Sequence, residues 1–370
     1  MTANQRFGLE RGPKTPLQAT LMLADGTRFV GWGLGDQTTT SGELIFTTAM
    51  TGYEEALTDP SYRGQLLMFT YPLIGSYGTA PRRRQSEDVQ PRGAILATLS
   101  PGSGDQPSLR DYLLGHRVPT MYGVDTRAIA RWIREYGALP AVLTVHDPQL
   151  QPQIDALQSA IRGCDYDSTD FVAETTVTHP ELHGAGSRLV ALLDCGNKRS
   201  VIETIVRRDV RVVVLPAHTP AADILRLQPR GLIISNGPGN PATATSIVAT
   251  VRELYGKLPL FGICFGHQLL ALAAGAGTYK LRFGHRGANH PVQDCVSGQA
   301  FVTTQNHGFA VDPASLPGDL YVSHRNVNDS TVEGLRHTDL YIRSVQFHPE
   351  GAPGPRDSGV ILDDWLAEIA

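Results

Sequence analysis

The sequence predicts an α/β protein of two domains, in which a β-rich domain precedes a domain built on a mainly parallel sheet. The chain has 370 residues, more than a single hydrophobic core usually organises. Hairpin-like segments open the first half, whereas short apolar runs alternate with helix-forming segments in the second half. This change in the sequence pattern predicts a first domain at 1–167, a linker at 168–187 and a second domain at 188–370.

The first half begins with β-strand signals and later contains one clear helix. Residues 17–23 and 27–32 flank Asp25-Gly26, a pair that favours a tight hairpin turn. The segment 125–136 has apolar side chains at helical spacing, with a capping Asp at its start and a Gly directly after it. The linker shows neither the strand nor the helix periodicity of apolar residues, and it is rich in Thr, His, Gly and Pro.

The second half alternates strands and helices. Four short apolar runs have the length of buried strands and lie at 189–193, 210–215, 231–235 and 258–263. Two segments between them suit helices, at 198–208 and 221–227. Such alternation implies crossover units and a parallel sheet, and after Thr278 the signal changes to shorter β-like pieces. Since ligands of these sheets lie at the carboxyl ends of strands, chemistry is expected just after Ser235, Ile263 and Phe347.

Composition and charge narrow the class of function. Hydrophobic residues make up 41% and charged residues 18% of the chain, which favours a packed core over disorder. The formal net charge of −4 gives no reason to expect nucleic acid as a partner. No apolar run approaches the roughly 20 residues of a membrane helix, so no membrane is expected. The polar segment 1–12 lacks the apolar core of a signal peptide, and a cytoplasmic location follows as the expectation.

Cys264 has the sequence context of a nucleophile. It lies in Gly-Ile-Cys-Phe-Gly at 262–266, between an apolar strand and the helix-forming segment 269–274. Gly-x-Cys-x-Gly in this setting is the cysteine form of the nucleophile elbow, where small neighbours let the chain bend sharply. The alternative is a buried structural cysteine, which is the interpretation for the three cysteines without such a context. These three are Cys164, Cys195 and Cys295.

A cysteine nucleophile needs a histidine that moves protons and a third group that orients it. Among the 12 histidines, His348 follows an apolar segment and stands two residues before Glu350. In an extended chain these two side chains point the same way, and Pro349 favours extended geometry at His348. His348 and Glu350 are therefore the predicted base and orienter. His267, which follows Cys264 in the first helical turn, is the alternative base.

Acyl transfer also needs backbone N–H groups that stabilise negative charge on an oxygen atom. The segment 236–239, Asn-Gly-Pro-Gly, follows an apolar strand and lets the backbone approach a ligand closely. The predicted donors are the N–H of Gly239 and the N–H of Phe265, the residue after the nucleophile. The alternative is an ordinary Gly/Pro turn.

Three motifs taken together resemble the class I, triad-type glutamine amidotransferases. They are Ser-Asn-Gly-Pro-Gly at 235–239, Gly-Ile-Cys-Phe-Gly-His-Gln at 262–268 and Gln-Phe-His-Pro-Glu at 346–350. They occur in the order that this family has. The resemblance implies a flavodoxin-like second domain and a triad in which Cys264 forms a γ-glutamyl thioester. It also implies that His348 is the general acid/base and that Glu350 orients it.

The first half narrows the resemblance to the carbamoyl-phosphate synthase small chain family. Segments 46–54 and 57–62, with sequences FTTAMTGYE and LTDPSY, look like its N-terminal domain. Two places depart from the family pattern: Phe265 stands where Leu is usual, and arginines occupy 82–84, which we interpret as a solvated loop. The resemblance also implies the residues that hold L-glutamine. They are Ser61, Gly237, Gly239, Phe265, Gln268, Asn306, Gly308 and Phe309.

The sequence has no signature of a metal or nucleotide site. His285 and His290 could be imagined as metal ligands, but no cysteine or carboxylate cluster in the sequence supports such a site, and no metal is expected. A Gly-x-x-x-x-Gly-Lys-[Ser/Thr] loop is absent, so ATP and Mg²⁺ are expected on another chain. The resemblance implies that this partner is the synthase large chain, in a heterodimer or an oligomer of heterodimers.

The resemblance implies that ammonia from L-glutamine passes internally to the large chain, which makes carbamoyl phosphate from it with bicarbonate and ATP. Carbamoyl phosphate would serve arginine and pyrimidine synthesis. Two alternatives are a free-standing cysteine hydrolase acting on peptides or γ-glutamyl compounds, and a regulatory or scaffolding subunit with a silent site. Activity that stands alone and accepts substrates larger than glutamine would indicate the first, whereas the intact triad and the complete set of glutamine-pocket motifs argue against the second.

Overall fold

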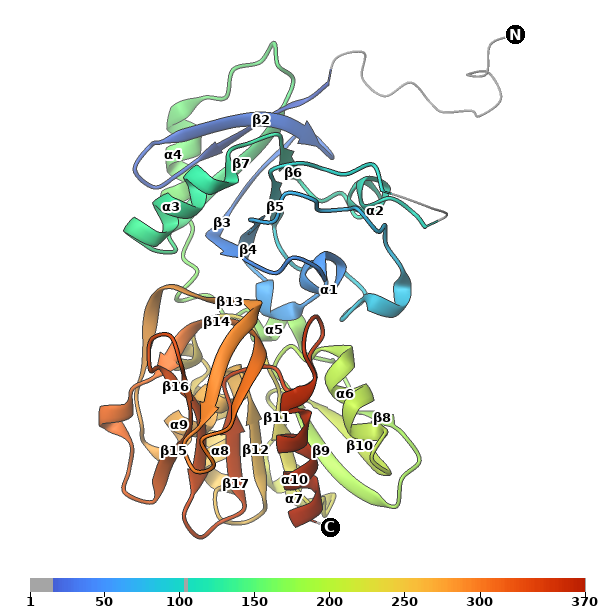
Figure 1. The fold of residues 1–370 in the computed structure, drawn as a ribbon, viewed down its shortest axis with the longest axis vertical. Helices are drawn as coiled ribbons and strands as arrows, with labels where there is room; N and C mark the ends of the chain where they lie inside the picture. Colours follow the sequence, from blue (N-terminus) through green and yellow to red (C-terminus); the bar gives the residue numbers. More distant parts are fainter. Residues whose placement is uncertain (1–15, 103–105, 370) are drawn as a thin grey trace.

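The computed structural model describes residues 16–102 and 106–369, which form two domains stacked along the long axis of the molecule (Figure 1). The polar segment 1–12, which led to the expected location, lies outside the described residues. Among the helices of the described part, none has the length and apolar character needed to cross a membrane.

The first domain is a closed β-barrel with the strand order β1-β2-β6-β5-β4-β3-β7. Its strands are β1 Gln18–Met22, β2 Arg28–Leu34, β3 Thr38–Thr47, β4 Gln65–Phe69, β5 Gly93–Leu96, β6 Thr120–Tyr122 and β7 Pro140–His146. The predicted hairpin is confirmed, because β1 and β2 pair antiparallel from Met22 opposite Arg28 onward. Side chains such as Leu21, Leu44 and Leu143 are fully buried in the barrel core.

Short helices accompany the barrel strands. They are α1 Tyr53–Leu57, α2 Leu109–Gly115, α3 Thr126–Tyr136 and α4 Ile154–Arg162, with the 3-10 turns η2 Pro60–Tyr62 and η3 Pro81–Arg83. Helix α3 confirms the predicted helix and its two ends. Asp125 Oδ1 accepts a hydrogen bond from Ala128 N at 2.9 Å, and Gly137 ends the helix with a φ of 102°.

The predicted linker at 168–187 is more structured than its composition suggests. It contains α5 Val172–Thr175 and β8 Glu181–His183. Strand β8 pairs antiparallel with β10 at the edge of the second sheet. Part of this segment therefore belongs to the second domain, because its backbone groups join the ladder of that sheet.

The centre of the second sheet is parallel, as predicted. Strands β10-β9-β11-β12-β17 run in this order, and each neighbouring pair is parallel. They are β9 Arg188–Asp194, β10 Val210–Pro216, β11 Leu232–Ile234, β12 Leu260–Ile263 and β17 Ile342–Val345. Successive residues of β9 belong to two different buried clusters, with Ala191 on one face of the sheet and Leu192 on the other.

Helices cover both faces of this sheet. The predicted helices are confirmed as α6 Arg199–Val206 and α7 Ala221–Arg226. The others are α8 Thr245–Leu254, α9 Phe265–Ala274 and α10 Val360–Glu368, with the 3-10 turns η4 Pro241–Thr243, η5 Pro313–Ser315 and η6 Asp357–Gly359. Trp365 of α10 is fully buried against Phe261 of β12, with ring centroids 5.3 Å apart.

A long hairpin replaces the short β-like pieces expected after Thr278. Strand β13 spans Thr278–Asp294 and β14 spans Ala300–Val311, and β15 Leu320–Asn326 and β16 Val332–His337 complete the sheet. The glycines that break the sequence pattern fall at register shifts of the β13/β14 pair, so they bend the ladder without ending it. The hairpin lies at the boundary between the domains (Figure 1). Ala138 N donates to Arg282 O at 2.7 Å and Thr48 N to Arg286 O at 3.1 Å, which joins the two domains directly.

The arginine run at 82–84 is more than a solvated loop. Glu54 of α1 is fully buried, and its carboxylate lies 3.5 Å from Arg83 Nη1 and 3.3 Å from Arg84 Nε. It also accepts a hydrogen bond from Ala80 N at 2.7 Å. Arg83 and Arg84 are half-buried, whereas Arg82 is exposed. Two of the three arginines therefore compensate a buried negative charge.

Replacing Arg83 and Arg84 together by Met is expected to lower the free energy of unfolding by about 2–4 kcal/mol. The change leaves the buried Glu54 carboxylate without a cation, and the value is reduced because both arginines are partly exposed. Urea unfolding of the whole chain measures it. Arg82→Met is the matched control and should stay within about 0.5 kcal/mol of the wild type. An equal effect of the control and the double variant would contradict this role.

Candidate active site

Cys264 lies on the turn between β12 and α9, as predicted. Its φ of 53° and ψ of −103° are a conformation that non-glycine residues rarely adopt, and such strain is concentrated at functional sites. A Cβ on Gly262 would lie 2.6 Å from Gly266 O, and a Cβ on Gly266 would lie 2.0 Å from Ile234 O. Both positions therefore need glycine, and the turn holds the thiol at the carboxyl end of the parallel strands.

Gly266→Ala is expected to lower kcat/KM for amide hydrolysis by about 100-fold or more. The new methyl group would meet the backbone of β11, so the elbow must shift, and a displacement of about 1 Å is enough for such a loss. Steady-state kinetics measures the effect. Gly275→Ala is the matched control: Gly275 also has a positive φ of 99°, but a Cβ there meets nothing within 4 Å. The control should lose stability and keep kcat/KM.

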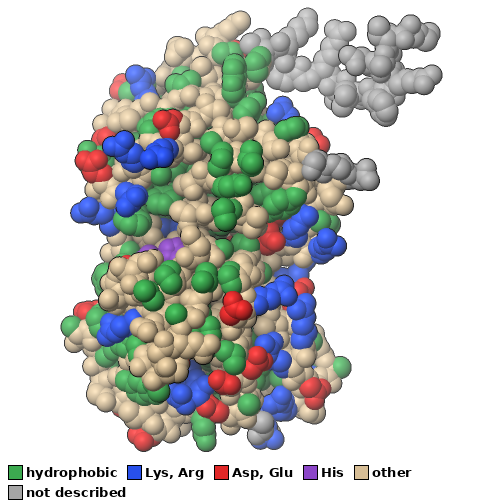
Figure 2. Space-filling model, in the orientation of Figure 1, with side chains coloured by type: hydrophobic (Ala, Val, Ile, Leu, Met, Phe, Trp, Pro, Cys, Tyr) green, Lys and Arg blue, Asp and Glu red, His purple; other side chains and the backbone are tan. Residues whose placement is uncertain are grey.

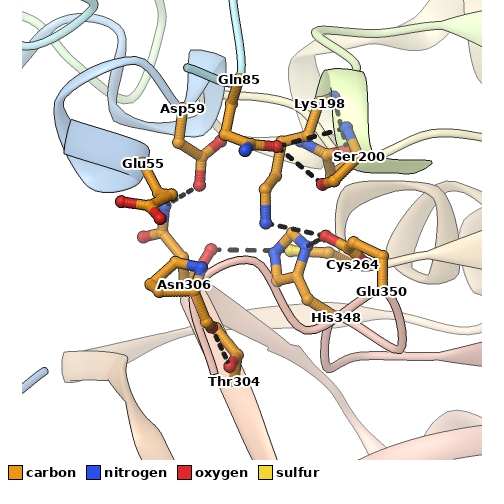
Figure 3. A network of polar contacts seen from close by, with 12 residues as sticks. Glu55, Asp59, Gln85, Lys198, Ser200, Cys264, Thr304, Asn306, His348 and Glu350 are labelled. Atoms are coloured by element: carbon orange, nitrogen blue, oxygen red, sulfur yellow. Dashed lines mark hydrogen bonds and ion pairs between the residues drawn. The ribbon is translucent and has the colours of Figure 1, made fainter. Parts of the chain in front are cut away.

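His348 and Glu350 follow β17 and lie beside Cys264 (Figure 3). His348 Nδ1 and Glu350 Oε1 are 2.8 Å apart, so the ring donates from Nδ1 to the carboxylate. His348 Nε2 is buried and has no hydrogen-bond partner among the described residues. Cys264 Sγ lies 3.5 Å from Asn306 O. The Cys264 side chain also acts electrostatically on the His348 ring, so the three side chains have the order of nucleophile, base and orienter that acyl transfer requires.

Lys198 is a fourth member of this network that the sequence analysis missed. Its Nζ lies 2.7 Å from Glu350 Oε1, and both side chains are 1% exposed. Burial alone would raise the pKa of Glu350, but the Lys198 and His348 cations hold it well below its usual range. Burial alone would lower the pKa of His348, but Glu350 overrides this and raises it to about 10. Glu350 is thus an ionised carboxylate shared by two buried cations.

The structure supports His348 over His267 as the base. His267 is fully buried on α9, and its Nδ1 lies 2.8 Å from Ser344 Oγ. Burial lowers the pKa of His267 to about 3, so the ring stays neutral at physiological pH. No carboxylate is paired with it among the described residues. Burial also raises the pKa of Cys195 well above its ordinary value, which agrees with a structural cysteine.

His285 does have carboxylate neighbours, contrary to the expectation from the sequence. Its Nε2 lies 2.9 Å from Asp329 Oδ2, and its Nδ1 lies 3.6 Å from Glu333 Oε1. Possible donor atoms of His285, His307 and Glu333 all lie within 4.8 Å of one another. Both ring nitrogens of His307, however, already have hydrogen-bond partners. The cluster therefore has the geometry of a buried ion pair. His290, beside it, is not in this donor set.

One cavity collects every residue that the resemblance assigns to glutamine. It is lined by Cys264 together with Ser61, Gly237, Gly239, Phe265, Gln268, Asn306, Gly308 and Phe309. Five further residues line it that the sequence analysis did not select: Glu43, Gln65, Tyr166, Arg286 and His307. Both domains thus contribute walls, and Cys264 lines the same cavity.

Hydrogen bonds across the domain boundary position the cavity walls. Asp59 caps η2 by accepting from Ser61 N at 2.9 Å, and its other carboxylate oxygen accepts from Asn306 Nδ2 at 3.1 Å. Ser61 Oγ accepts from Asn236 Nδ2 at 3.0 Å. Within the second domain, Gln268 Nε2 donates to Phe309 O at 2.8 Å. The first domain is therefore part of the site, because Ser61 reaches the cavity only when the two domains are packed together.

The oxyanion donors differ in part from those predicted. Gly239 N donates to Tyr166 Oη at 3.2 Å, so the predicted Gly239 donor is already occupied. Among the described residues, no hydrogen bond is recorded for the N–H of Gly237 or of Phe265. Both residues line the cavity beside Cys264. A Cβ on Gly237 would lie 2.3 Å from Cys195 O, which explains the glycine there. Gly237 and Phe265 are therefore the better pair of donors.

A second cavity lies on the His348 side of the site. Its walls come from both domains and include Thr47, Ala49, Lys198, His348 and Pro353. Asn306 lines both cavities, whereas Cys264 lines the first and His348 the second. Cys264 and His348 thus border two spaces, one lined by the predicted glutamine residues and one lined by His348 and Lys198.

Comparison with known families agrees with this geometry. Residues 191–367 match the family model described as glutamine amidotransferase class-I. The match covers the elbow, the His348–Glu350 pair and the second-domain walls of the cavity. The second domain is therefore a class I glutamine amidotransferase domain, with a barrel domain placed before it.

The first domain identifies the branch of that class. Residues 21–143 match the model described as carbamoyl-phosphate synthase small chain, CPSase domain. The carbamoyl phosphate synthase small chain of Methanopyrus kandleri is 44% identical over 356 residues, covering 95% of this chain and 99% of that protein. That of Akkermansia muciniphila is 44% identical over 368 residues, covering 96% and 98%. The chain belongs to the carbamoyl-phosphate synthase small chain family.

Proposed function

We propose that this chain is the glutaminase subunit of a carbamoyl-phosphate synthase and hydrolyses L-glutamine to glutamate and ammonia. One observation carries the proposal. Cys264, backed by the His348–Glu350 pair, opens into a cavity lined by all eight residues that the resemblance assigns to glutamine. The relatives named carbamoyl phosphate synthase small chain, which match nearly the whole length of this chain, support it.

The reaction proceeds through a thioester. Cys264 Sγ attacks the γ-carboxamide carbon while His348 Nε2 holds the thiol proton, and the N–H groups of Gly237 and Phe265 stabilise the negative oxygen. His348 then donates that proton to the departing nitrogen, which leaves as ammonia. Water, deprotonated by His348, cleaves the thioester to release glutamate and the free thiol. Glu350 keeps the ring in the orientation and tautomer that each transfer needs.

Ammonia released at His348 enters the second cavity, since His348 is one of its lining residues. The proposed recipient is the synthase large chain, which carries the ATP and Mg²⁺ sites, in a heterodimer or an oligomer of heterodimers. This chain then needs no cofactor of its own. Carbamoyl phosphate made in this way would serve arginine and pyrimidine synthesis in the cytoplasm. Transfer within the complex keeps ammonia from becoming ammonium, which is not a nucleophile.

Release of glutamate from L-glutamine tests the proposal. The purified chain is assayed alone, and then with the large chain, ATP, Mg²⁺ and bicarbonate. A low rate alone that rises clearly with the complete synthase supports a coupled glutaminase. A high rate that ignores the partner would favour a free-standing hydrolase. No release under either condition would favour a silent scaffold.

A further inference from the structure

A buried ion pair at His285 lies next to the strand that forms one wall of the glutamine cavity. His285 stands opposite His307 in the β13/β14 ladder, and the two rings meet edge to face with centroids 4.9 Å apart. His307 lines the cavity together with its chain neighbours Asn306 and Gly308. His285 is buried and is not one of the lining residues. The shortest route from His285 to the cavity therefore runs through the ring of His307.

The ring of His307 fixes the backbone of this wall. Its Nδ1 lies 2.7 Å from Phe309 O, and its Nε2 lies 2.8 Å from Gln305 Oε1. Burial lowers the pKa of His307 well below its ordinary value, and the His285 cation acts in the same direction. The ring is therefore neutral, and its one N–H donates from Nδ1 to the Phe309 carbonyl oxygen. A shift of this ring would move the backbone on both sides of it.

Two carboxylates hold the two nitrogens of the His285 ring. Asp329 Oδ2 lies 2.9 Å from Nε2, and Glu333 Oε1 lies 3.6 Å from Nδ1. Glu333 Oε1 also accepts a hydrogen bond from Asn326 Nδ2 at 3.0 Å. Burial alone would lower the pKa of His285, but Glu333 and Asp329 override this and raise it. The ring is thus held in its charged form, and it ties β13 to β16 and to the loop before β16.

Glu333 depends on this cation more than Asp329 does. The Glu333 side chain is fully buried, whereas that of Asp329 is 43% exposed and keeps contact with water. Among the described residues, no further carboxylate forms an ion pair with His285. The other ionisable groups around this cluster are two histidines kept neutral by burial, a phenol whose pKa burial raises, and one cation: His290, His307, Tyr279 and Arg286. Loss of the His285 charge would therefore leave a buried carboxylate without a cation.

We propose that the His285–Glu333 ion pair positions the cavity wall at 306–309 for glutamine, acting through the ring of His307. This inference rests on the proposed glutaminase function. Neither member of the pair lines the cavity, so His285 and Glu333 are positioning residues and not catalytic ones. A carboxylate left unpaired in the interior would draw in water or move toward the surface, and the ring packed on His285 would lose its support. The loss should appear in the binding of glutamine and not in the chemical step.

The ion pair also predicts the direction of a pH effect on binding. Since the folded state raises the pKa of His285 above its ordinary value of 6.5, the pair is complete below that value. It is lost as the pH rises through the raised pKa, because the ring then gives up its proton. KM for glutamine should therefore increase toward alkaline pH by more than the titration of glutamine itself explains.

The test is a cycle of variants measured in the complete synthase. KM and kcat for glutamine are determined between about pH 6 and 9 for the wild type, His285→Gln, Glu333→Gln and the variant with both changes. The double variant replaces the ion pair by two amides that can hydrogen-bond to each other, and it provides the baseline for titration of the substrate. His337→Gln is the matched control. His337 is another buried histidine, 3.3 Å from Asp319, and it does not line the glutamine cavity.

His285→Gln should raise KM for glutamine by about 10-fold or more and change kcat by less than about 3-fold, because it leaves the buried carboxylate unpaired. The double variant should return KM to within about 3-fold of the wild type, since no buried charge remains. The ratio of the wild-type KM to that of the double variant should rise with pH. His337→Gln should lower stability and leave KM unchanged.

Three results would overturn the proposal in a wild type that releases glutamate. They are an unchanged KM in His285→Gln, a loss of kcat as large as the rise in KM, and a double variant no better than His285→Gln. The last two would indicate general damage to the fold, which removal of a second buried group does not repair. A wild type that releases no glutamate would refute the glutaminase function itself, whatever the ion pair does.

Discussion

Cys264→Ser is expected to lower kcat for glutamate release by about 10⁴-fold or more while the fold is kept. The hydroxyl occupies nearly the same space as the thiol, so the strained turn and its glycine neighbours are undisturbed. A serine hydroxyl is a much weaker nucleophile than a cysteine thiol, because an alcohol is far less acidic than a thiol and is deprotonated much less readily by the same base. Removing one member of a nucleophile–base unit costs about as much as removing the whole unit.

The complete synthase gives the sharper version of this experiment. With Cys264→Ser, synthesis of carbamoyl phosphate from glutamine should disappear, whereas synthesis from added ammonium salts should continue. That result would show that the variant no longer supplies ammonia from glutamine, while the small and large chains still assemble into an active synthase. Cys295→Ser is the matched control, since Cys295 is an exposed cysteine and should leave both activities unchanged. Full glutamine-dependent activity in Cys264→Ser would remove Cys264 as the nucleophile.

Local sequence was sufficient to predict the turn that holds Cys264 and the contact between His348 and Glu350. The turn at Cys264 is determined within five residues, because Gly262 and Gly266 remove the side chains that would block it. His348 and Glu350 are two residues apart, so a single extended segment brings their side chains together. The parallel strands could also be predicted from the sequence, because β9 and β10 are buried on both faces of the sheet and appear as continuous apolar runs.

Partners distant in sequence could not be predicted in the same way. Lys198 is 152 residues from Glu350, and only the tertiary fold of the second domain brings its amine to the carboxylate. Tyr166 reaches Gly239 across 73 residues, and this contact removes the donor that the local motif suggested. Arg84 meets Glu54 across 30 residues. Nothing in the neighbouring residues indicates such pairs, because burial decides which charge needs a partner.

The β13/β14 hairpin shows a second reason why part of the fold differs from the prediction made from the sequence. Glycines at 284 and 287 interrupt the alternating pattern, and an interrupted pattern predicts several short strands. In the fold they accompany register shifts and make room for neighbouring groups: a Cβ on Gly287 would lie 2.4 Å from Thr48 Oγ1 of the first domain. Gly284 and Gly287 thus obscure the strand pattern in the sequence. In the fold the same two glycines allow β13 to pack against the barrel and place Arg286 in the cavity wall.

Glu350→Gln is expected to lower kcat by about 10²- to 10⁴-fold and to lower the pKa of His348 below its ordinary value of 6.5. The amide keeps the shape of the carboxylate and removes its charge. Burial, the largest influence on His348, favours the neutral ring, and Lys198 acts in the same direction. Glu350 is the largest influence that opposes both, ahead of the smaller contribution of Cys264, so without Glu350 the ring should be neutral at neutral pH instead of protonated.

Nuclear magnetic resonance of ¹⁵N-labelled histidine measures the titration of His348 directly, alongside the pH profile of kcat. Lys198→Met is the informative companion variant, because Lys198 lowers the pKa of His348 and its removal should not reduce that pKa. The two variants therefore shift the histidine differently although each breaks the same buried network. If Glu350→Gln left the pKa of His348 raised, the carboxylate would not be its cause. If Lys198→Met lowered the pKa as far as Glu350→Gln does, the two effects would reflect a general opening of the site to water, and the specific role of Glu350 would have to be abandoned.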